Sequence, residues 1–492
     1  QILPVGPTGY ADSPYQSCSA FAGNPYFIDL DLLAADGLLT KKDYAAINWG
    51  GDAAHVDYGT LYEKRFAVLR KAYVNFLKKR PVPGYETPYP DDWYRFRFLS
   101  SDWLPDYCLY MALKEEQGGA PWYAWPQPLR DRDAAARAEA LARLDDRVLL
   151  HAYLQTEFTR QWDAVRAYAH AHGVRIIGDL PIYVSRDSVE MWATPELFKI
   201  DAAGNPVSVA GTPPDQFSAT GQYWGNPIYD WAYMARQTPA FSWWGERMAH
   251  ALRLYDVVRI DHFRGFASYY TVPFGEKTAR RGKWCKGPGM TLFDSLRKRC
   301  GELPIMAEDL GFLTPEVRAL LKETGFPGMK VLQFAFDSRE GSDYLPHTYT
   351  SHCVVYTGTH DNDTVMGWMK TAPKASVKFA TEYLNLTEEE GYNWGMMRAA
   401  WSSVADMAIV PMQDLIGLGS EARINIPSTL GENWKWRALE GQITKDLAKK
   451  LYKYMQMYGR ISEKVLAEQA KKAAEKEAAK KKTSDKKKSS EK

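Results

Sequence analysis

Carboxylates stand at the ends of several short apolar runs in this chain, and one of them has an arginine close by. In the segment Val-Val-Arg-Ile-Asp-His-Phe, Arg259 and Asp261 are two residues apart, so on a strand their side chains lie on the same face. A guanidinium lowers the pKa of a neighbouring carboxyl group and keeps it ionised, as a carboxylate nucleophile requires. A structural ion pair at a strand end is the alternative interpretation of these two residues.

A second carboxyl group that carries a proton would complete the chemistry, because breaking a glycosidic bond needs a nucleophile or base together with a proton donor. The segment Met-Ala-Glu-Asp-Leu-Gly offers Glu308 or Asp309. A proton donor needs a raised pKa, and a nearby anionic Asp261 would raise it. Periodicity does not choose between the two residues, since both faces of the expected strand are apolar.

A histidine and two aspartates follow another apolar run, in Thr-Gly-Thr-His-Asp-Asn-Asp-Thr. His360 and Asp361 are adjacent there, and Asp363 lies close by. A His-Asp pair in this position could hold sugar hydroxyl groups. A metal site is the alternative, but no further His or Cys has the spacing of a ligand set, so we predict neither a metal nor a cofactor.

The elements that must position these residues are apolar runs separated by helical patterns, and we expect each run to form a strand. Their apolar character is continuous, as in parallel strands covered on both faces. No Gly-x-Gly-x-x-Gly follows a run, so the fingerprint of dinucleotide binding is absent. The expected strands are residues 2–6, 174–184, 257–263, 304–310, 329–336, 352–361 and 407–416.

The acidic and polar residues stand at the C-terminal ends of different expected strands, and Asp179 occupies such a position as well. This placement indicates an α/β fold of the (β/α)8 type, a TIM barrel, because such barrels keep their active sites at that end. An unpaired carboxylate is costly to bury in an ordinary strand end. The pattern supplies seven strands where a closed barrel of this kind has eight.

Two stretches between the expected strands, residues 34–150 and 185–256, are too long for connecting loops and must carry structure of their own. We expect them to be helical insertions over the C-terminal mouth of the barrel, within one catalytic domain at residues 1–458. Residues 459–492 form a Lys- and Ala-rich tail that is too polar to build a core. Too few residues follow the last expected strand for a C-terminal β-sandwich.

The composition argues against several classes of protein. Its 17 Trp and 30 Tyr could stack on sugar rings, although a large core also explains them. The five scattered cysteines form no Cys-x-x-Cys pair, which favours a reducing, cytoplasmic location. No apolar run reaches the roughly 20 residues that span a bilayer. Residues 471–492 hold ten Lys and four acidic residues, so the positive charge lies in the tail, and we expect no nucleic-acid or membrane partner.

Several long segments, in order along the chain, resemble the amylomaltases, which are bacterial 4-α-glucanotransferases related to the plant disproportionating enzyme. The likeness runs from Gln1 to about Arg460. Arg-Ile-Asp alone would indicate only the wider α-amylase clan, whereas several long motifs in sequence are specific. The segments are GPTGYADSPYQSCSAFAGNPYFIDLDLL, GDLPIYVSRDSVEMW, PPDQFSATGQYWGNPIYDW, VVRIDHFRGF, MAEDLG, YTGTHDNDT and GLGSEARINIPSTLGENWKWR.

The resemblance implies that Asp261 is the nucleophile, Glu308 the general acid/base and Asp361 the stabiliser of the transition state. Arg259 and His360 would flank these three carboxylates. The residues that the resemblance places at the substrate are Arg259, His360, Ser13, Tyr15, Asp179, Asp215, Gln222, Trp224 and Asn425.

The resemblance also implies the reaction: segments of α-1,4-glucans, or maltooligosaccharides, would pass to acceptor sugars with retention, through a covalent glycosyl-enzyme. A hydrolase of the α-amylase clan is one alternative, although GDLPIYV lacks the Asp-x-x-x-Asn-His usual in that group. A non-catalytic glucan-binding protein or an inactive fragment is another, and the three retained carboxylates argue against it.

Relatives begin with a strand and a helix before the segment that opens this chain, so we expect the first barrel strand to be missing. A barrel with two unpaired edges is prone to aggregate, and we expect either a fragment of a longer protein or poor activity. From the family we also expect the loop at residues 263–273 to overhang the cleft. We expect Trp434 and Trp436 to pack the barrel.

Overall fold

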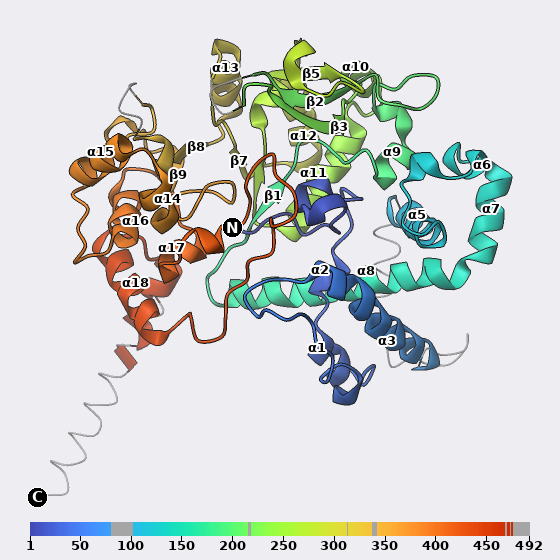
Figure 1. Ribbon diagram of the computed structural model, residues 1–492, viewed down its shortest axis with the longest axis horizontal. Helices are drawn as coiled ribbons and strands as arrows, with labels where there is room; N and C mark the ends of the chain where they lie inside the picture. Colours follow the sequence, from blue (N-terminus) through green and yellow to red (C-terminus); the bar gives the residue numbers. More distant parts are fainter. Residues whose placement is uncertain are drawn as a thin grey trace, which may run out of the picture.

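The computed structural model describes residues 1–79, 102–214, 218–311, 313–336, 342–467, 470–472 and 474–475. Within these ranges, parallel strands connected by helices form the centre of an α/β fold, flanked by an antiparallel sheet and by a group of helices (Figure 1). No helix in these ranges is both long and apolar enough to cross a membrane.

Six parallel strands carry the candidate residues at or just beyond their C-terminal ends. They form two sheets of three strands, in the orders β1-β4-β7 and β10-β9-β8. Every residue of β1, β4, β7 and β9 is buried, which explains their continuous apolar sequence. The strands are β1 (Ile177–Leu180), β4 (Val257–Ile260), β7 (Ile305–Ala307), β8 (Gly328–Val331), β9 (Cys353–Tyr356) and β10 (Met407–Ile409).

The predicted strand at residues 2–6 is wrong, whereas each of the other six runs contains a strand. The N–H of Ile2 donates to the carbonyl of Ile177 on β1 at 2.9 Å, but Pro4 has no N–H to continue a ladder. The run at 407–416 is also shorter than expected. After β10, Pro411 precedes the helix α17 (Met412–Ile416).

Helices connect consecutive parallel strands, as parallel pairing requires. Helix α11 leads into β4, α12 into β7 and α13 into β8, and neighbouring members of this series contact each other (Figure 1). Three more helices lie between β9 and β10. The helices are α11 (Ser242–Leu254), α12 (Met290–Cys300), α13 (Pro315–Thr324), α14 (Val365–Thr371), α15 (Lys374–Leu384) and α16 (Tyr392–Ser402).

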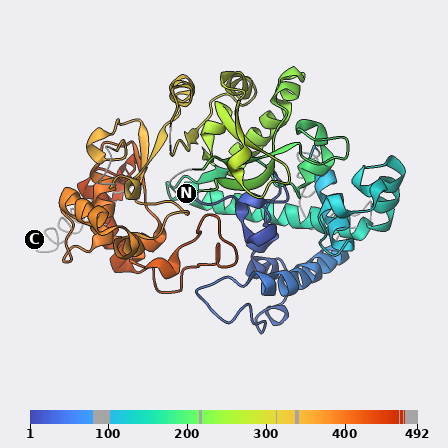
Figure 2. The same cartoon turned by 45° about the horizontal axis from the view of Figure 1, so that its top comes forward.

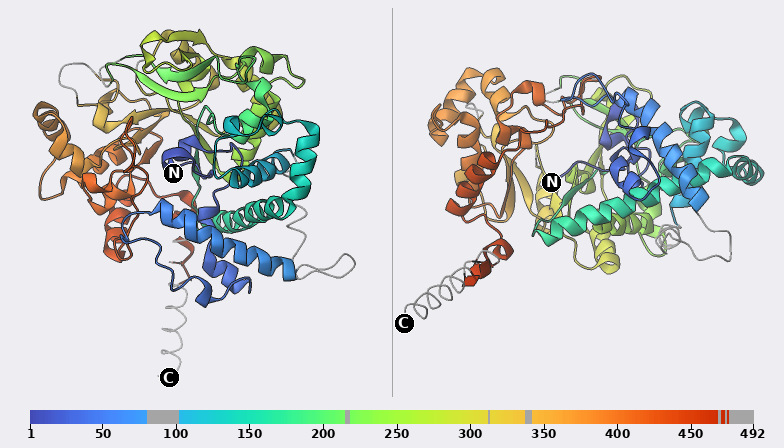
Figure 3. Two further views of the ribbon diagram at one scale, coloured as in Figure 1. Left: turned by 45° about the vertical axis from the view of Figure 1, so that its right-hand side comes forward. Right: turned by 90° about the horizontal axis from the view of Figure 1, so that it is seen from below.

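The stretch at residues 34–150 is helical, as predicted, where the structure describes it. Its helix α5 packs on α8, which leads into β1, and Tyr107, Tyr110 and Tyr153 are fully buried between them and their neighbours. Figure 3 shows these helices on one side of the molecule, opposite the C-terminal helices. They are α1 (Leu30–Ala35), α2 (Tyr58–Thr60), α3 (Phe66–Lys79), α5 (Leu104–Glu116), α6 (Gln127–Arg130), α7 (Ala134–Arg143) and α8 (Asp145–Ala171).

The second insertion, residues 185–256, is not purely helical as predicted. Besides α9 (Val189–Ala193) and α10 (Trp231–Arg236) it contains β2 (Ser208–Thr212) and β3 (Gln222–Pro227). These strands join β5 (Ser268–Pro273) and β6 (Lys283–Lys286) in an antiparallel sheet of order β3-β2-β5-β6. The expected overhanging loop is therefore the 3-10 helix η8 (Phe263–Phe266) followed by a central strand, because Ser-Tyr-Tyr-Thr-Val suits a pleated, half-buried surface.

The described residues beyond β10 form helices and loops and contribute no strand to a sheet. After α17 come the 3-10 helix η12 (Ser420–Ala422) and, following a long loop, α18 (Lys445–Met457). Figure 2 shows this loop, in the red-brown colour of the C-terminal part, between the orange helices and the blue N-terminal segments. Before this loop turns back, the side chain of Asn425 bonds that of Asp361, just beyond β9, so this part of the chain reaches the C-terminal end of that strand.

Candidate active site

Arg259, on β4, lies between two carboxylates. Its Nη1 atom donates to both oxygens of Asp179, at 2.8 and 2.7 Å, and its Nη2 atom lies 3.0 Å from Oδ1 of Asp261. The side chain of Asp179 is fully buried, whereas that of Asp261 is 31% exposed. Burial alone lowers the pKa of Arg259, but Asp179 and Asp261 outweigh it and raise this pKa well above its usual range. A permanent positive charge therefore faces the Asp261 side chain.

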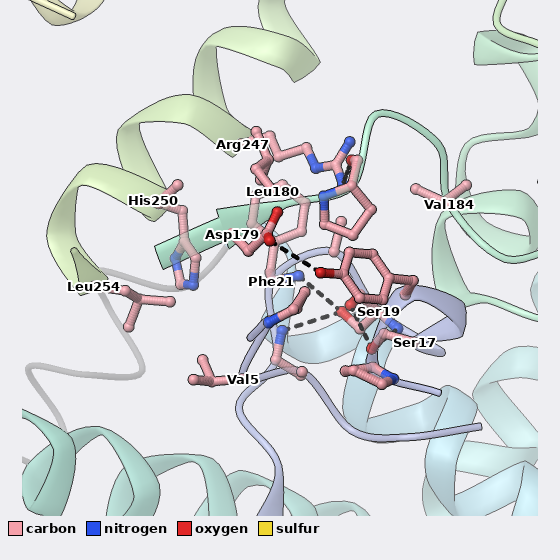
Figure 4. Close-up of a pocket in the computed structure, with 18 of the residues that line it drawn as sticks. Val5, Ser17, Ser19, Phe21, Asp179, Leu180, Val184, Arg247, His250 and Leu254 are labelled. Carbon is pink, nitrogen blue, oxygen red and sulfur yellow. Dashed lines mark hydrogen bonds between the residues drawn. The ribbon is translucent and has the colours of Figure 1, made fainter. Parts of the chain in front are cut away.

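Tyr15 joins the buried end of this ion pair to His360. Its hydroxyl donates to Oδ2 of Asp179 at 2.9 Å and lies 3.4 Å from Nδ1 of His360. The Tyr15 and His360 rings are stacked, with centroids 5.0 Å apart. Ser13 accepts a hydrogen bond from the Tyr15 N–H at 3.3 Å and thereby caps the 3-10 helix η2 (Pro14–Gln16). Figure 4 shows Asp179 at the end of β1, with the dashed bond that it accepts.

Glu308 follows β7, and its carboxylate is fixed by two backbone N–H groups. The N–H of His262 donates to Oε2 and the N–H of Leu310 to Oε1, both at 2.8 Å. Burial, with the charge of Asp261 as the second cause, raises the pKa of Glu308 to about 7, against the opposing effect of Arg259. Glu308 can therefore carry a proton near neutral pH, while Asp261 stays paired with a cation. Two carboxyl groups whose environments differ in this way suit an acid and a nucleophile.

Asp309, the alternative to Glu308, faces a different element. It is buried, and its Oδ1 atom accepts a hydrogen bond from the N–H of Met329, on β8, at 2.7 Å. Gly328 lies directly beside the same carboxylate: a Cβ there would meet Oδ2 of Asp309 at 2.5 Å. Asp309 thus stabilises the β7–β8 connection, and the structure places only Glu308 beside Asp261.

Asp361 lies just beyond β9 and is the most exposed of the three predicted carboxylates, at 46%. Its Oδ1 atom accepts a hydrogen bond from Nδ2 of Asn425 at 2.6 Å and lies 3.4 Å from Nε2 of His360. The N–H of Asn425 also donates to the carbonyl of His360, at 3.1 Å. Asn425 therefore belongs to the site through two direct contacts.

Asp363, which the sequence left as an alternative to Asp361, has a structural position. Its two carboxylate oxygens accept hydrogen bonds from the N–H of Thr364 at 2.8 Å and from Oγ of Ser420 at 2.7 Å. It thus ties η12 to the start of α14. Among the described residues, no group of three or more His, Cys, Asp and Glu side chains has an arrangement that could hold a metal ion.

Gln222 and Trp224, on β3, reach the carboxylates through His262. The indole Nε1 of Trp224 donates to Oε1 of Gln222 at 3.0 Å, and the Trp224 ring meets the His262 ring edge-on, with centroids 4.8 Å apart. His262 follows Asp261 directly and donates its N–H to Glu308. The remaining predicted substrate residue, Asp215, lies outside the described residues.

His262 is a site residue that the sequence interpretation did not single out. Its backbone is left-handed, with φ at +53°, which is uncommon for a residue other than glycine. This conformation belongs to the turn in which its N–H bonds Glu308. Burial lowers the pKa of His262 to about 4, against the opposing charge of Asp261 and together with the charge of Arg264, so His262 is neutral at physiological pH. Adjacency to Asp261 was the available signal, but nothing in the sequence indicated the positive φ.

Comparison with known proteins agrees with this geometry. A family model described as 4-alpha-glucanotransferase matches residues 1–442, which include every candidate residue above. This chain belongs to the 4-alpha-glucanotransferase family. It is 48% identical over 464 residues to the 4-alpha-glucanotransferase of Clostridium butyricum, covering 94% of this chain and 93% of that protein. It is also 48% identical to the enzyme of the same name from Thermus thermophilus, over 90% of this chain and 88% of that one.

A solved structure of an amylomaltase shows that the likeness extends to the fold. The amylomaltase from Streptococcus agalactiae in complex with acarbose matches with a TM-score of 0.88 at 39% identity, over 93% of this chain and 91% of that one. The resemblance to the amylomaltases that the motifs predicted is therefore confirmed, and the chain that carries this site belongs to the 4-alpha-glucanotransferase family.

In this member of the 4-alpha-glucanotransferase family, Trp434 also lies at the site, which was not expected. Trp434, predicted to pack the barrel, contacts the rings of Tyr15 and His360, with centroid distances of 5.7 and 5.8 Å. The sequence could not reveal this contact, because it joins a C-terminal loop to the first residues of the chain.

Proposed function

We propose that this chain is a retaining 4-α-glucanotransferase that moves segments of α-1,4-glucans between maltooligosaccharides. The observation that carries the proposal is the pairing of Glu308, whose pKa is raised to about 7, with Asp261, which faces the permanent charge of Arg259. Membership of the family supports the same conclusion. Glucans are the substrates that the aromatic and hydroxyl-bearing side chains around these carboxylates suit.

In the first step Asp261 attacks the anomeric carbon of an α-1,4-linked glucan. The bond from this carbon to the glycosidic oxygen breaks, and Glu308 gives its proton to the departing oxygen. The products are a shortened glucan and a covalent glycosyl-enzyme on Asp261. A retaining enzyme of this kind requires the two carboxyl groups to lie ~5–5.5 Å apart.

In the second step Glu308, now ionised, takes a proton from the hydroxyl of an acceptor sugar. The acceptor oxygen attacks the same carbon and displaces Asp261, so that two inversions give net retention. Glu308 regains its proton and Asp261 its free carboxylate. Every proton and bond is accounted for by these two side chains and the two sugars.

The neighbouring residues hold the reacting groups and the sugar. Arg259 pairs with Asp261, and Asp179 with Tyr15 fixes the guanidinium. Asp361, the most exposed of the three predicted catalytic carboxylates, would bind sugar hydroxyl groups and stabilise the positive charge of the transition state. We assign Gln222 and Trp224 to binding sugar beside His262, and Ser13 to holding Tyr15. We also retain Asp215 as a predicted substrate residue from its motif.

Incubation with maltotriose distinguishes transfer from hydrolysis. A transferase gives glucose together with maltodextrins longer than maltotriose. A hydrolase of the α-amylase clan gives maltose and glucose without elongation, and a binding protein leaves the substrate unchanged. Elongated products would support the proposal, and either of the other results would refute it.

We further propose that the two parallel sheets are parts of one (β/α)8 barrel. The N–H of Ala307, on β7, donates to the carbonyl of Pro327 at 3.0 Å, next to β8, so the two sheets meet there. On the opposite flank, the Tyr356 hydroxyl of β9 donates to Gln1 at 2.7 Å and Ile2 bonds β1. The two sheets therefore meet directly on one flank and through residues 1–2 on the other, as parts of one barrel would.

The domain boundaries are proposed on similar grounds. Helix α18 packs its Leu447, Leu451 and Tyr454 against Trp394 and Trp401 of α16, which supports a catalytic unit that ends near residue 458. The stretches at 34–150 and 185–256 are then insertions, and residues 459–492 stay the predicted polar tail, although Arg460 at its start donates to the carbonyls of Trp401 and Ser403. A cytoplasmic location stays a prediction, to which five free thiols, all in described positions, lend support.

A further inference from the structure

Three aromatic rings from distant parts of the chain meet beside Asp179 and Asp361. The Tyr15 and His360 rings are 5.0 Å apart, Tyr15 and Trp434 are 5.7 Å apart, and His360 and Trp434 are 5.8 Å apart. Tyr15 comes from η2, His360 from the end of β9 and Trp434 from the C-terminal loop. Each ring therefore limits the movement of the other two.

The backbone of Trp434 is held in a conformation that a bulky residue rarely adopts. Its φ is +67°, in the left-handed region, which costs free energy for any side chain with a Cβ and is unusual for a large one. The N–H of Trp434 donates to the carbonyl of Ile424 at 2.7 Å, and its carbonyl accepts from the Tyr58 hydroxyl at 2.8 Å. Both peptide groups that flank the ring are thus fixed by neighbours.

The residues that bond the carbonyl of Trp434 and the backbone of its successors belong to the first insertion, residues 34–150. Beyond Tyr58, the N–H of Val56 donates to the carbonyl of Lys435 at 2.7 Å, and the N–H of Arg437 donates to the carbonyl of Ala54 at 2.9 Å. His55 and Trp436 form an antiparallel bridge between these hydrogen bonds. Residues 54–58 and 434–437 therefore form a short two-stranded clasp, which fits the position of the loop in Figure 2.

The partners of the Trp434 ring are the residues that orient two of the site carboxylates. The Tyr15 hydroxyl donates to Asp179, which holds Arg259. His360 lies 3.4 Å from Asp361. The Trp434 ring therefore lies against the partners of both carboxylates.

We propose that Trp434 is a positioning residue of the transfer reaction, and that the clasp of residues 54–58 and 434–437 keeps its ring against Tyr15 and His360. This inference rests on the proposed glucan transfer. It gives the first insertion a direct part in catalysis, through Tyr58 and the clasp. Trp434 acts on the rate of the chemical step more than on glucan binding, because its contacts reach the groups that serve the transition state.

The test measures kcat and KM for maltotriose disproportionation in three variants. Trp434→Ala should lower kcat by about 10- to 100-fold, as misplacement of catalytic groups does, with KM within about threefold of the wild type. Trp434→Phe keeps a ring in place and should recover kcat to within about threefold of the wild type. Tyr58→Phe removes only the hydrogen bond from the Tyr58 hydroxyl to the Trp434 carbonyl, within the clasp, and should lower kcat by about 2- to 10-fold.

Two matched variants control for the loss of an aromatic ring or hydroxyl. Tyr168→Ala removes a ring on α8 that is 70% exposed, and Tyr62→Phe removes a hydroxyl on a side chain that is 63% exposed. Both should keep the wild-type kcat. Thermal melts and circular dichroism show whether each variant is folded; if Trp434→Ala does not fold, Tyr58→Phe decides.

The outcomes separate this inference from the proposed function. If the wild type forms no elongated maltodextrins, glucan transfer itself is refuted. If the wild type elongates maltotriose and folded Trp434→Ala keeps its kcat, only the role of Trp434 is refuted. A raised KM at unchanged kcat would also overturn it, since Trp434 would then be a sugar-binding platform. Wild-type kcat in Tyr58→Phe would overturn the role of the clasp.

Discussion

Glu308 and Asp309 are adjacent in sequence, yet their carboxylates serve different parts of the molecule. Glu308 accepts the N–H groups of His262 and Leu310 beside Asp261, whereas Asp309 accepts the N–H of Met329 on β8. Successive residues at a strand end point to opposite sides. At the end of β7, one side faces the active site and the other faces the neighbouring strand β8. This divergence gives one residue a chemical role and the other a structural role.

A pair of substitutions tests this division. Glu308→Gln should lower kcat by about 10²- to 10⁴-fold, because the general acid is lost, while the melting temperature changes little. Asp309→Ala should leave kcat of the folded enzyme within a few-fold but destabilise it by about 1–3 kcal/mol, because the buried N–H of Met329 loses its acceptor. Kinetics and thermal melts on both variants are sufficient; full activity in Glu308→Gln would reverse the assignment.

The raised pKa of Glu308 predicts the pH dependence of the first step. The proton donor must be protonated, so kcat/KM for maltotriose should fall as pH rises through about 7. A donor such as α-maltotriosyl fluoride releases fluoride without needing a proton, so its kcat/KM should lack this alkaline limb. An alkaline limb that persists with the fluoride would place the titrating group elsewhere.

Arg259→Lys should damage both stability and catalysis. One ammonium group cannot reproduce the contacts of two guanidinium nitrogens with Asp179 and Asp261, and Asp179 is fully buried. Leaving that carboxylate poorly paired should cost about 3–5 kcal/mol of unfolding free energy, measured by denaturant titration.

The exposed ion pair of Arg299 with Glu246 provides the control for this change. Arg299→Lys should cost less than about 1 kcal/mol. Equal losses of unfolding free energy in the two variants would show that the contacts of Arg259 stabilise the protein no more than an exposed ion pair does.

Asn425→Ala should reduce turnover by releasing Asp361. The lost hydrogen bond of 2.6 Å goes to a charged group, and bonds of that class contribute about 1.5–3 kcal/mol, so kcat should fall by about 10- to 100-fold. Asn75→Ala removes a comparable amide donor, which bonds the carbonyl of Leu38 away from the site, and should leave kcat unchanged. An unchanged kcat in Asn425→Ala would remove this residue from the site.

The central strands and their chemistry could be predicted because burial on both faces leaves a continuous apolar sequence. Asp179 and Asp261, and the pair Glu308 and Asp309, were found in this way, at the ends of β1, β4 and β7. The motifs of the family then selected Glu308 over Asp309 and Asp361 over Asp363, and added Asn425. The strand at residues 2–6 was predicted wrongly, because its apolar residues pack without a full hydrogen-bond ladder beside Pro4.

Features that depend on contacts between distant segments had no signal in the sequence. Two strands of the antiparallel sheet, β2 and β3, lie in the stretch at 185–256 that was predicted to be a helical insertion. The strand β5 lies inside this sheet only because β2 and β6 pair with it. The clasp between residues 54–58 and 434–437 has no periodicity of its own. Trp434 in the site and the left-handed turn at His262 follow from such pairings.

The most direct test of Asp261 as the nucleophile is to trap the glycosyl-enzyme. Glu308→Gln is mixed with α-maltotriosyl fluoride, which forms the intermediate without a proton donor but leaves no base to complete transfer, and the protein is analysed by intact and peptide mass spectrometry. We predict one added maltotriosyl group on the peptide that contains Asp261, lost when azide is supplied as a nucleophile that needs no base. Consumption of the fluoride without an adduct, or an adduct on a residue other than Asp261, would contradict the account.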